Sequence, residues 1–506
     1  MGRAIMVQGT ASHVGKSVLV AGLCRWFQRE GLRVAPFKAQ NMALNSFVTP
    51  DGGEIGRAQA AQAEAARVAP AVEMNPILLK PEGNSRSQVV VKGRVLTSMD
   101  AAEYHRRVPE LWPVVEASLN QLVETFDLVV IEGAGSPVEM NLLESDIVNM
   151  RVARAVGAPV LLVADIERGG VFAALVGTME LLEPELRELI AGFVVNKFRG
   201  DPALFAGGIT YLQERLRRPV LGVVPWIPDL AIAQEDSLGL PRSGSDPDAP
   251  GAPGASVDVA VIRFPRIANF DDLEPLQRRP GVRVRYVERL EDFGRPDLAI
   301  LPGTKTTRAD LAFMRERSLD LAVIAHVRRG GAVLGICGGY QMLGRRIDDP
   351  DGVEDAPGGE DGLGLLPVDS RYAREKETRQ VRGSLVADRG PLAAHRREIA
   401  AYEIHMGRTA GSCAPFARIV TADGARFDGA VSPDGLVVGT YLHGLFHNPS
   451  VVAALVDWFS GRKGFDPPET PPEVDAYDRL ADTLSGTLDV GRLRMIAGVT
   501  GPVGSA

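Results

Sequence analysis

Short apolar runs recur along the first half of the chain, and each ends in glycine or in a polar residue. Runs of this length are typical of strands buried on both faces of a parallel sheet. Two of the stretches between them, 18–29 and 58–68, have the apolar spacing or alanine content of helices. The alternation predicts an α/β domain with a parallel sheet. Its strands are predicted at 4–7, 126–132, 160–165, 192–197 and 220–228, and a further strand is predicted to begin at residue 34.

The second half of the chain repeats this pattern after a change of composition. Residues 241–256 are rich in Pro, Gly and Ser and have no periodic apolar residue, which predicts a linker. Apolar runs follow at 257–262, 332–336 and 436–442. We therefore expect four parts, namely a first domain over 1–240, the linker over 241–256, a second α/β domain over 257–465, and a C-terminal helix and tail over 466–506.

Composition narrows the class of protein. The chain has 506 residues, 45% of them hydrophobic and 24% charged, as in a soluble globular protein of two or three domains. A net charge of −8 with no basic block disfavours nucleic acid and anionic membranes as partners. Three distant cysteines indicate a reducing compartment. With no signal peptide or membrane-spanning run, we expect a cytoplasmic protein with small-molecule partners and an undetermined oligomeric state.

The first predicted strand leads into a glycine-rich loop that ends in Gly-Lys-Ser at a helix start. Loop N–H groups and the helix N-terminus would bind phosphates, Lys16 would add a positive charge, and Ser17 would bind Mg²⁺. Five residues separate Gly9 from Gly15, one more than the usual spacing. This loop resembles that of dethiobiotin synthetase and its relatives, which implies ATP-dependent activation of a carboxylate. The alternative is a chance match. The predicted ATP-binding residues here are Gly9, Thr10, Gly15, Lys16 and Ser17.

Polar side chains follow the second predicted strand. Ligands of open α/β sheets bind at the carboxyl ends of the strands, so we expect these side chains to face the substrate. The predicted substrate-binding residues are Lys38, Gln40, Asn41 and Asn45. Asp51 is a further predicted metal ligand, and 75–81 and 85–93 are predicted loops that add polar and basic groups. For any one of these residues, an ordinary surface loop is an equal alternative.

Three later residues complete the predicted ATP site. Glu132 ends a buried strand, where a carboxylate opposite a phosphate loop is the expected Mg²⁺ partner. Asp146 follows at the same edge of the predicted sheet and is predicted to be catalytic. Whether it contacts metal, substrate or incoming ammonia is left open. Asn196 ends the fifth strand. The Asn-Lys pair there resembles the base-recognition position of related P-loop proteins, which implies that Asn196 contacts adenine.

The apolar run 332–336 ends at Cys337, and Gly338 and Gly339 precede a helical pattern from Tyr340. This order predicts a strand, a tight turn and a helix with a nucleophile at the tip. The helix N-terminus would favour the thiolate, and the Gly338 N–H is placed to help form an oxyanion hole. The alternative is a buried structural cysteine. His443 ends the run 436–442, so a Cys–His pair on one sheet is expected.

With Cys337 and His443 at the ends of their predicted strands, residues 257–460 resemble a class I glutamine amidotransferase domain. The resemblance implies that Cys337 attacks the side-chain amide of glutamine, that a thioester forms, and that ammonia leaves, with His443 as base and then acid. It also implies that Gly303 supplies a second oxyanion donor, beside Gly338, and that Gln341 belongs to the glutamine-binding site. Many members carry Glu two positions after the histidine, where this chain has Leu445. The third triad member is therefore open, with Glu403 and His405 as candidates for orienting or lining the site.

The whole chain resembles the cobyric acid synthases, a family of cobalamin-biosynthetic glutamine amidotransferases. The resemblance implies amidation of the b, d, e and g carboxylates of adenosylcobyrinic acid a,c-diamide through acyl phosphates, with ATP, Mg²⁺ and glutamine. Two alternatives stay open, namely cobyrinic acid a,c-diamide synthase and a ParA-like nucleotide switch fused to an inactive amidotransferase domain. The segments that carry the resemblance are 8–17, 38–46, 132–149, 196–201, 335–341, 402–407 and 439–446.

Overall fold

Contacts within the computed structural model divide the chain into two units, described separately below. Unit 1 comprises Met1–Ala43, Gly53–Ala233 and Glu473–Ala506, and unit 2 comprises Leu44–Gly52 and Gln234–Pro472. This division differs from the expected one, because 44–52 join the second unit and the C-terminal segment joins the first. The predicted linker at 241–256 and the end of the tail lie outside the described residues. The structure describes residues 2–82, 85–141, 146–228, 230, 232, 257–354, 356–421, 424–470 and 474–499.

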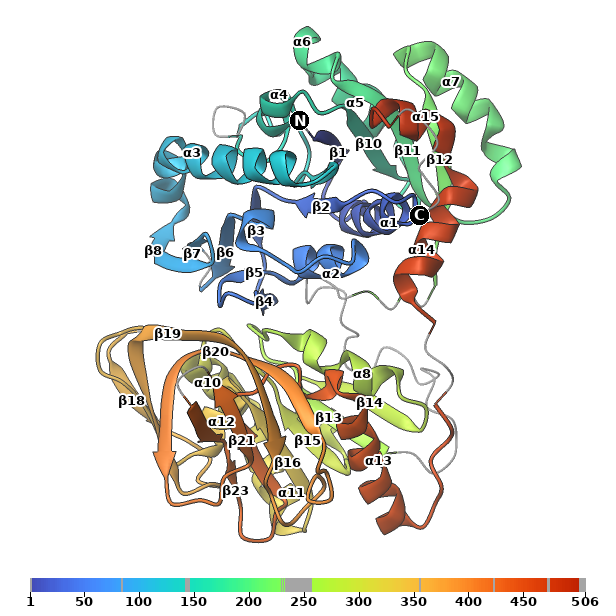
Figure 1. Cartoon of the computed structure of the whole chain (residues 1–506). Coiled ribbons are helices and arrows are strands. Elements are labelled where there is room, and N and C mark those ends of the chain that lie inside the picture. Colours follow the sequence, from blue (N-terminus) through green and yellow to red (C-terminus); the bar gives the residue numbers. More distant parts are fainter. Residues whose placement is uncertain are drawn as a thin grey trace. The chain divides into compact units, whose positions relative to one another are not determined.

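Unit 1 is built on a parallel sheet, as the apolar runs predicted. Six described strands pair in the order β12-β11-β10-β1-β9-β2, and every pairing is parallel. All five residues of β9 are buried, as expected of a strand covered on both faces. Helices lie on both sides of the sheet (Figure 1). The strands are β1 (Arg3–Gly9), β2 (Val34–Phe37), β9 (Leu128–Glu132), β10 (Val160–Asp165), β11 (Ile190–Phe198) and β12 (Val220–Pro225).

The C-terminal segment forms two helices, not the single helix expected within 466–506. Figure 1 shows α14 in red beside α1 in blue. Gly22 permits this approach, because a Cβ there would lie 2.4 Å from Leu484 Cδ1. Arg25 forms an ion pair with Asp475 at 3.0 Å. The helices of unit 1 are α1 (Lys16–Arg29), α2 (Arg57–Ala65), η1 (Val72–Met74), α3 (Ala101–Thr125), α4 (Met150–Val156), α5 (Val171–Leu181), α6 (Pro184–Arg187), η3 (Pro202–Phe205), α7 (Ala206–Leu216), α14 (Ala476–Thr487) and α15 (Val490–Ile496).

A second, smaller sheet in unit 1 was not predicted. It pairs the described strands in the order β3-β6-β7-β8, so the expected loops at 75–81 and 85–93 were wrong. Leu78 and Val90 face each other across β6 and β7 and are buried, and this pairing determines the strands. None of the described helices, the long α3 included, is apolar enough over sufficient length to cross a bilayer. The additional strands of unit 1 are β3 (Gln40–Met42), β5 (Glu54–Gly56), β6 (Ile77–Pro81), β7 (Arg86–Val91) and β8 (Arg94–Asp100).

Unit 2 contains the second predicted parallel sheet. Its described strands pair in the order β14-β13-β15-β16-β24-β23, with only β23 antiparallel. The strands are β13 (Val257–Ile262), β14 (Val282–Val287), β15 (Leu298–Leu301), β16 (Ala332–Ile336), β23 (Ala430–Val431) and β24 (Val437–Thr440). The helices are η5 (Phe270–Leu273), α8 (Glu274–Arg278), α9 (Leu290–Phe293), α10 (Thr307–Glu316), α11 (Leu319–Arg328), α12 (Gly338–Leu343), η6 (Leu445–His447) and α13 (Pro449–Lys463).

A long antiparallel hairpin covers residues for which the sequence predicted no sheet. Strand β19 (Val368–Leu385) pairs with β20 (Glu398–Gly411) and belongs to a sheet ordered β18-β17-β19-β21-β22. Residues 348–362 are rich in Asp and Gly, which is typical of a loop, but part of this segment is strand in the structure. The other strands of unit 2 are β4 (Ser46–Val48), β17 (Arg346–Asp349), β18 (Gly358–Asp361), β21 (Ala417–Thr421) and β22 (Gly424–Asp428).

Candidate active sites

The glycine-rich loop of unit 1 connects β1 to α1, and Gly15 is its last residue. Gly15 has φ +98°, a left-handed conformation that favours glycine, and a Cβ there would lie 2.2 Å from Asn196 Nδ2. The Asn196 amide donates to the Val14 carbonyl at 2.8 Å. The described contact of Asn196 is therefore with the loop itself, and adenine recognition by this residue stays a prediction.

The Lys16 ammonium lies within the loop. Its Nζ donates to the carbonyl oxygens of Ala11 at 3.0 Å and Gly135 at 3.1 Å. Gly135 follows β9, so Lys16 connects the phosphate loop to the segment after the neighbouring strand. A phosphate bound at the loop would require a positive charge at this position.

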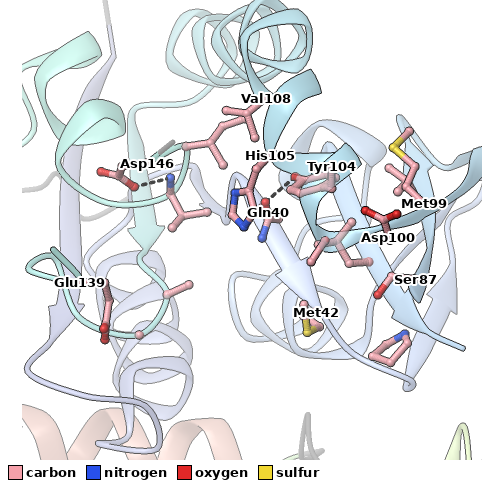
Figure 2. Close-up of a pocket in the computed structure, with 18 of the residues that line it drawn as sticks. Gln40, Met42, Ser87, Met99, Asp100, Tyr104, His105, Val108, Glu139 and Asp146 are labelled. Atoms are coloured by element: carbon pink, nitrogen blue, oxygen red, sulfur yellow. Dashed lines mark hydrogen bonds between the residues drawn. The ribbon is translucent and has the colours of Figure 1, made fainter. Parts of the chain in front are cut away.

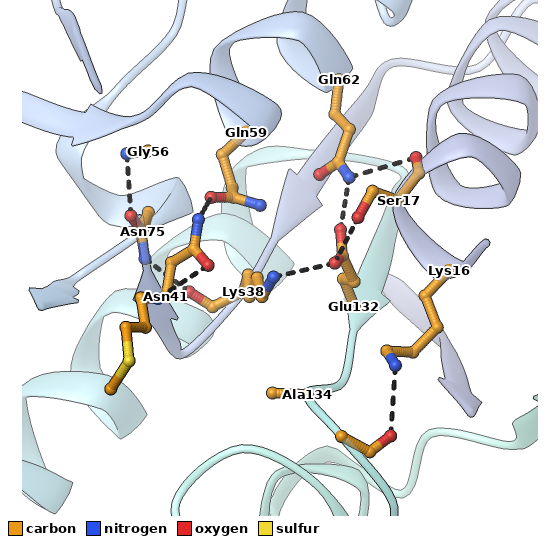
Figure 3. Close-up of polar contacts among 12 residues, drawn as sticks. Lys16, Ser17, Lys38, Asn41, Gly56, Gln59, Gln62, Asn75, Glu132 and Ala134 are labelled. Atoms are coloured by element: carbon orange, nitrogen blue, oxygen red, sulfur yellow. Dashed lines mark hydrogen bonds and ion pairs between the residues drawn. The ribbon is translucent and has the colours of Figure 1, made fainter. Parts of the chain in front are cut away.

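Glu132 is the centre of a buried polar cluster at the end of β9 (Figure 3). Its carboxylate accepts hydrogen bonds from Ser17 Oγ at 2.8 Å, Lys38 Nζ at 2.9 Å and the Gln62 amide. Burial alone would raise the pKa of Glu132, but the charge of Lys38 and the hydrogen bonds from Lys38, Gln62 and Ser17 hold it below its usual range. The carboxylate is therefore ionised and held in a fixed position.

Two oxygen ligands in this cluster suit Mg²⁺. Ser17 Oγ and Glu132 Oε1 are in contact, and Mg²⁺ in nucleotide sites takes one or two protein oxygens and fills its other positions with phosphate and water. No group of three or more His, Cys, Asp and Glu side chains suited to a metal occurs among the described residues. Asp51, the third predicted ligand, belongs to unit 2, where its carboxylate accepts a hydrogen bond from the Thr49 hydroxyl.

The predicted substrate residues have different surroundings. Lys38 contacts Glu132, Asn41 donates to Gln59 Oε1 at 2.9 Å, and Gln40 accepts from the Tyr104 hydroxyl. Asn45 belongs to unit 2 and accepts from the Phe270 N–H at 3.2 Å. Of the four, only Gln40 lines the pocket described next.

A pocket of about 500 Å³ lies in unit 1 between α3, the small sheet and the segment after β9 (Figure 2). Much of its wall is apolar, and Gln40, Tyr104 and His105 supply polar groups that lie together in Figure 2. Gly135 lines this pocket and also accepts the hydrogen bond from Lys16. The pocket is therefore adjacent to the phosphate loop.

Asp146 lines the same pocket, but its carboxylate is already engaged with backbone. One oxygen accepts from the N–H groups of Val148 and Asn149, each at 2.9 Å, and the other accepts from Arg151 at 3.3 Å. Val148 and Asn149 precede α4 and Arg151 lies in its first turn, so Asp146 holds the segment that leads into the helix. The structure thus shows a structural role, and a catalytic one stays a prediction.

Cys337 occupies the sharp turn between β16 and α12, as predicted. Its φ of +52° and ψ of −107° are strained for a residue with a side chain. The turn is held by the Cys337 N–H, which donates to the Thr440 carbonyl at 2.8 Å, and by the neighbouring glycines. A Cβ at Gly339 would lie 1.9 Å from the Leu301 carbonyl oxygen. The thiol side chain remains partly exposed, as a nucleophile must.

His443 follows β24 and is held by a carboxylate that the sequence did not reveal. Its Nδ1 lies 2.6 Å from Asp272 Oδ2, and Asp272 Oδ1 accepts the Gly444 N–H at 2.7 Å. Burial would lower the pKa of His443, but the Asp272 charge and the hydrogen bonds to Asp272 and Cys337 raise it to about 10. The Tyr402 ring stacks on the imidazole with centroids 5.4 Å apart. Cys337, His443 and Asp272 thus form a triad-like arrangement.

Neither sequence candidate for the third position forms a described hydrogen bond or ion pair with the histidine. Glu403 pairs with Arg426, and the His405 ring stacks on Tyr441 at 3.9 Å. Leu445 is buried in the core. The acidic residues that close the segment 263–272, after the first strand of the domain, were the only signal that pointed to Asp272.

Gly303 and Gln341 lie close to this triad. A Cβ at Gly303 would lie 3.0 Å from His443 Cε1, which places this glycine directly beside the ring. Gln341 is buried, donates to the Tyr441 hydroxyl at 3.1 Å and accepts from the Tyr372 hydroxyl at 2.9 Å. The structure therefore brings together the residues that were predicted in unit 2 for glutamine binding and oxyanion stabilisation.

Comparison with known proteins identifies the family of each domain and of the whole chain. Residues 5–240 match the CobQ/CobB/MinD/ParA nucleotide binding domain, and residues 258–451 match the CobB/CobQ-like glutamine amidotransferase domain. A cobyric acid synthase from Sorangium cellulosum is 53% identical over 98% of both chains. Those from Moorella thermoacetica and Paracoccus denitrificans are 48% and 49% identical, over 99% and 98% of this chain and 99% of theirs. The chain therefore belongs to the cobyric acid synthase family and is a glutamine-dependent, ATP-using ligase.

Proposed function

We propose that this protein amidates the b, d, e and g carboxylates of adenosylcobyrinic acid a,c-diamide to give adenosylcobyric acid. The observation that carries the proposal is the contact of one residue, Gly135, with both the Lys16 ammonium and the pocket of about 500 Å³. A carboxylate held in that pocket would be close to the phosphate of ATP bound at the loop. The names of the relatives support this choice over cobyrinic acid a,c-diamide synthase.

The phosphate-loop unit would activate the carboxylate. A free carboxylate does not react with ammonia, because it would have to expel oxide, which is a very poor leaving group. A carboxylate oxygen attacks the γ-phosphorus of ATP, the bond to the bridging oxygen breaks, and an acyl phosphate and ADP result. Lys16 stabilises charge on the transferred group, and Lys38 keeps Glu132 ionised. Mg²⁺ held by Ser17 and Glu132 would neutralise phosphate charge when bound. Ammonia then attacks the acyl carbon, and phosphate leaves with the amide formed.

The glutaminase unit would supply the ammonia. The Cys337 sulfur attacks the amide carbon of glutamine while His443, which holds the thiol proton because its pKa is raised to about 10, delivers that proton to the departing ammonia. Water, activated by the same imidazole, then cleaves the thioester to give glutamate. Asp272 keeps the imidazole in one orientation, because it is hydrogen-bonded to Nδ1 and so leaves Nε2 to exchange protons.

The test is a product count by mass spectrometry. The protein is incubated with Mg-ATP, glutamine and adenosylcobyrinic acid a,c-diamide, and conversion of four carboxyl groups to amides is expected. Amidation of cobyrinic acid instead would assign the protein to the a,c-diamide step. Amidation of neither compound, with ATP still bound, would favour a nucleotide switch with an inactive amidotransferase domain.

A further inference from the structure

A short segment of the first predicted domain is part of unit 2. The sequence predicts residues 44–52 in the first domain, but their contacts group them with the residues of the glutaminase. The Gly52 carbonyl accepts the Thr378 hydroxyl at 2.8 Å, and the Val48 carbonyl accepts the Gln380 amide at 2.5 Å. Both donors lie on β19, so the segment is attached to the long hairpin of unit 2.

The start of this segment holds the turn that carries Asp272. Asn45 is fully buried, and its side-chain oxygen accepts the Phe270 N–H at 3.2 Å. The Asn269 amide donates to the Ser46 carbonyl at 2.9 Å, and the Asn269 carbonyl accepts the Asp272 N–H at 3.1 Å. Asn269 has φ +53°, an uncommon conformation for a residue with a side chain. These contacts therefore stabilise a turn that would otherwise be disfavoured.

The next residues of the segment pack against the side chain that covers His443. Val48 and Tyr402 belong to one buried cluster, and Phe47 packs against it with its ring 5.4 Å from the Tyr402 ring. Tyr402 in turn stacks on the imidazole of His443. The backbones of these two residues also exchange hydrogen bonds at 3.0 and 2.8 Å. Phe47 and Val48 thus support the ring that lies against the catalytic base.

The same cluster extends to the nucleophile. Ile404 belongs to it, and the Ile404 carbonyl oxygen lies 3.7 Å from the Cys337 sulfur. Each member of the triad is therefore in contact with a residue that the segment 45–48 supports. In a close-packed interior, a displaced support moves the side chain that rests on it. A displacement of about 1 Å in a catalytic group can lower the rate about 10²-fold.

We propose that Asn45 and Phe47 are positioning residues of the glutaminase. Asn45 holds the turn of Asp272, and Phe47 keeps Tyr402 against the imidazole of His443. The glutaminase therefore depends on residues from the first predicted domain. Asn45 accordingly acts on ammonia production and not on binding of the corrinoid, as the sequence predicted. The inference rests on the assignment of the glutaminase triad.

The test measures two rates in the full-length protein supplied with Mg-ATP and adenosylcobyrinic acid a,c-diamide, namely glutamate formation from glutamine and amidation with ammonium salts. Asn45→Ala and Phe47→Ala should each lower kcat for glutamine by about 10–100-fold and change its KM by less than about threefold. Amidation with ammonia should change by less than about threefold. Phe47→Tyr keeps the ring and should restore kcat. Asn120→Ala, on the exposed face of α3, is the matched control and should behave as wild type.

Counting the active sites separates positioning from misfolding. The glutamine analogue 6-diazo-5-oxo-L-norleucine alkylates a glutaminase nucleophile, and peptide mapping then counts the labelled Cys337. Asn45→Ala should reach the wild-type extent of labelling although its turnover is slow. Labelling that falls in proportion to kcat would indicate misfolded protein and overturn the proposal.

Two kinetic outcomes would also overturn it. Unchanged glutamine kinetics in both alanine variants would show that the segment does not position the triad. Loss of ammonia-dependent amidation in Asn45→Ala, with glutamate formation intact, would return Asn45 to the corrinoid site. A Cys337→Ala variant that still forms glutamate would instead refute the triad on which the inference rests.

Discussion

Replacing Asp272 by Asn tests whether this carboxylate completes the glutaminase site. The change keeps the size of the side chain but removes the charge that faces His443 Nδ1 at 2.6 Å. Asn can still accept one hydrogen bond, either from the imidazole or from the Gly444 N–H that Asp272 now binds at 2.7 Å. It cannot do both with the same strength, because its amide nitrogen is only a donor.

The magnitude follows from these two contacts. A hydrogen bond to a charged group contributes about 1.5–3 kcal/mol, so loss of the charge and weakening of both contacts should remove about 3–4 kcal/mol. That corresponds to a fall in glutamine-dependent kcat/KM of about 10²–10³-fold. In serine triads the same change costs about 10⁴-fold, which is the upper limit here.

The assay measures amidation with glutamine and, separately, with ammonium salts. Asp272→Asn should show the full loss with glutamine and less than about a threefold change with ammonia, which bypasses the glutaminase site. Asp457→Asn, on the exposed face of α13, is the matched control and should behave as wild type. Wild-type activity of Asp272→Asn with glutamine would refute the triad, and equal loss with both nitrogen sources would indicate misfolding.

The pKa of His443 adds a test by pH. It is raised to about 10 from an ordinary value of 6.5, so the pair with Asp272 stabilises the fold fully below about pH 6.5 and loses that contribution as pH rises through about 10. The difference in urea midpoint between the wild type and Asp272→Asn should therefore be largest at pH 6 and shrink toward pH 10. A difference that grows with pH would contradict the assigned ion pair.

Three further substitutions test the two sites. Cys337→Ala should abolish glutamine-dependent amidation yet leave ammonia-dependent amidation, and failure of ammonia to rescue it would disprove the division of labour. Lys16→Ala should remove synthesis with either nitrogen source and weaken ATP binding in calorimetry, whereas retained turnover would exclude the phosphate-loop assignment. Lys38→Met should destabilise unit 1 by about 3–5 kcal/mol, because the buried Glu132 loses its cation. Since the wild-type pKa of Glu132 is lowered from 4.5, this loss should be fully present well above pH 4.5 and fade as pH falls below it, as urea unfolding at pH 8 and pH 3.5 would show.

Local sequence was sufficient to predict the strands that carry the nucleophile and the phosphate loop. The apolar runs predicted β10, β13 and β16 with their observed ends, and each begins directly after a proline, serine or glycine. The strained turn at Cys337 was also predictable, since glycines follow it directly. In these cases the residues that decide the structure are neighbours in the chain.

The antiparallel sheets were not predictable in the same way. The segments of β6 and β7 contain lysine, arginine and glutamine beside their apolar residues, so the sequence predicts loops there. Their strand conformation depends on pairing with each other and on burial of alternate side chains, which a single segment does not show.

Sequence by itself determined which chemistry each half of the chain carries, because the phosphate loop and the cysteine turn are short motifs whose function depends on adjacent residues. Tertiary structure alone decided what surrounds them. Asp272 lies 171 positions from His443, and Asp475 lies 450 positions from Arg25. Such pairs form only when distant segments fold together, because hydrogen bonds and ion pairs depend on distance in space and leave no periodic signal in the sequence.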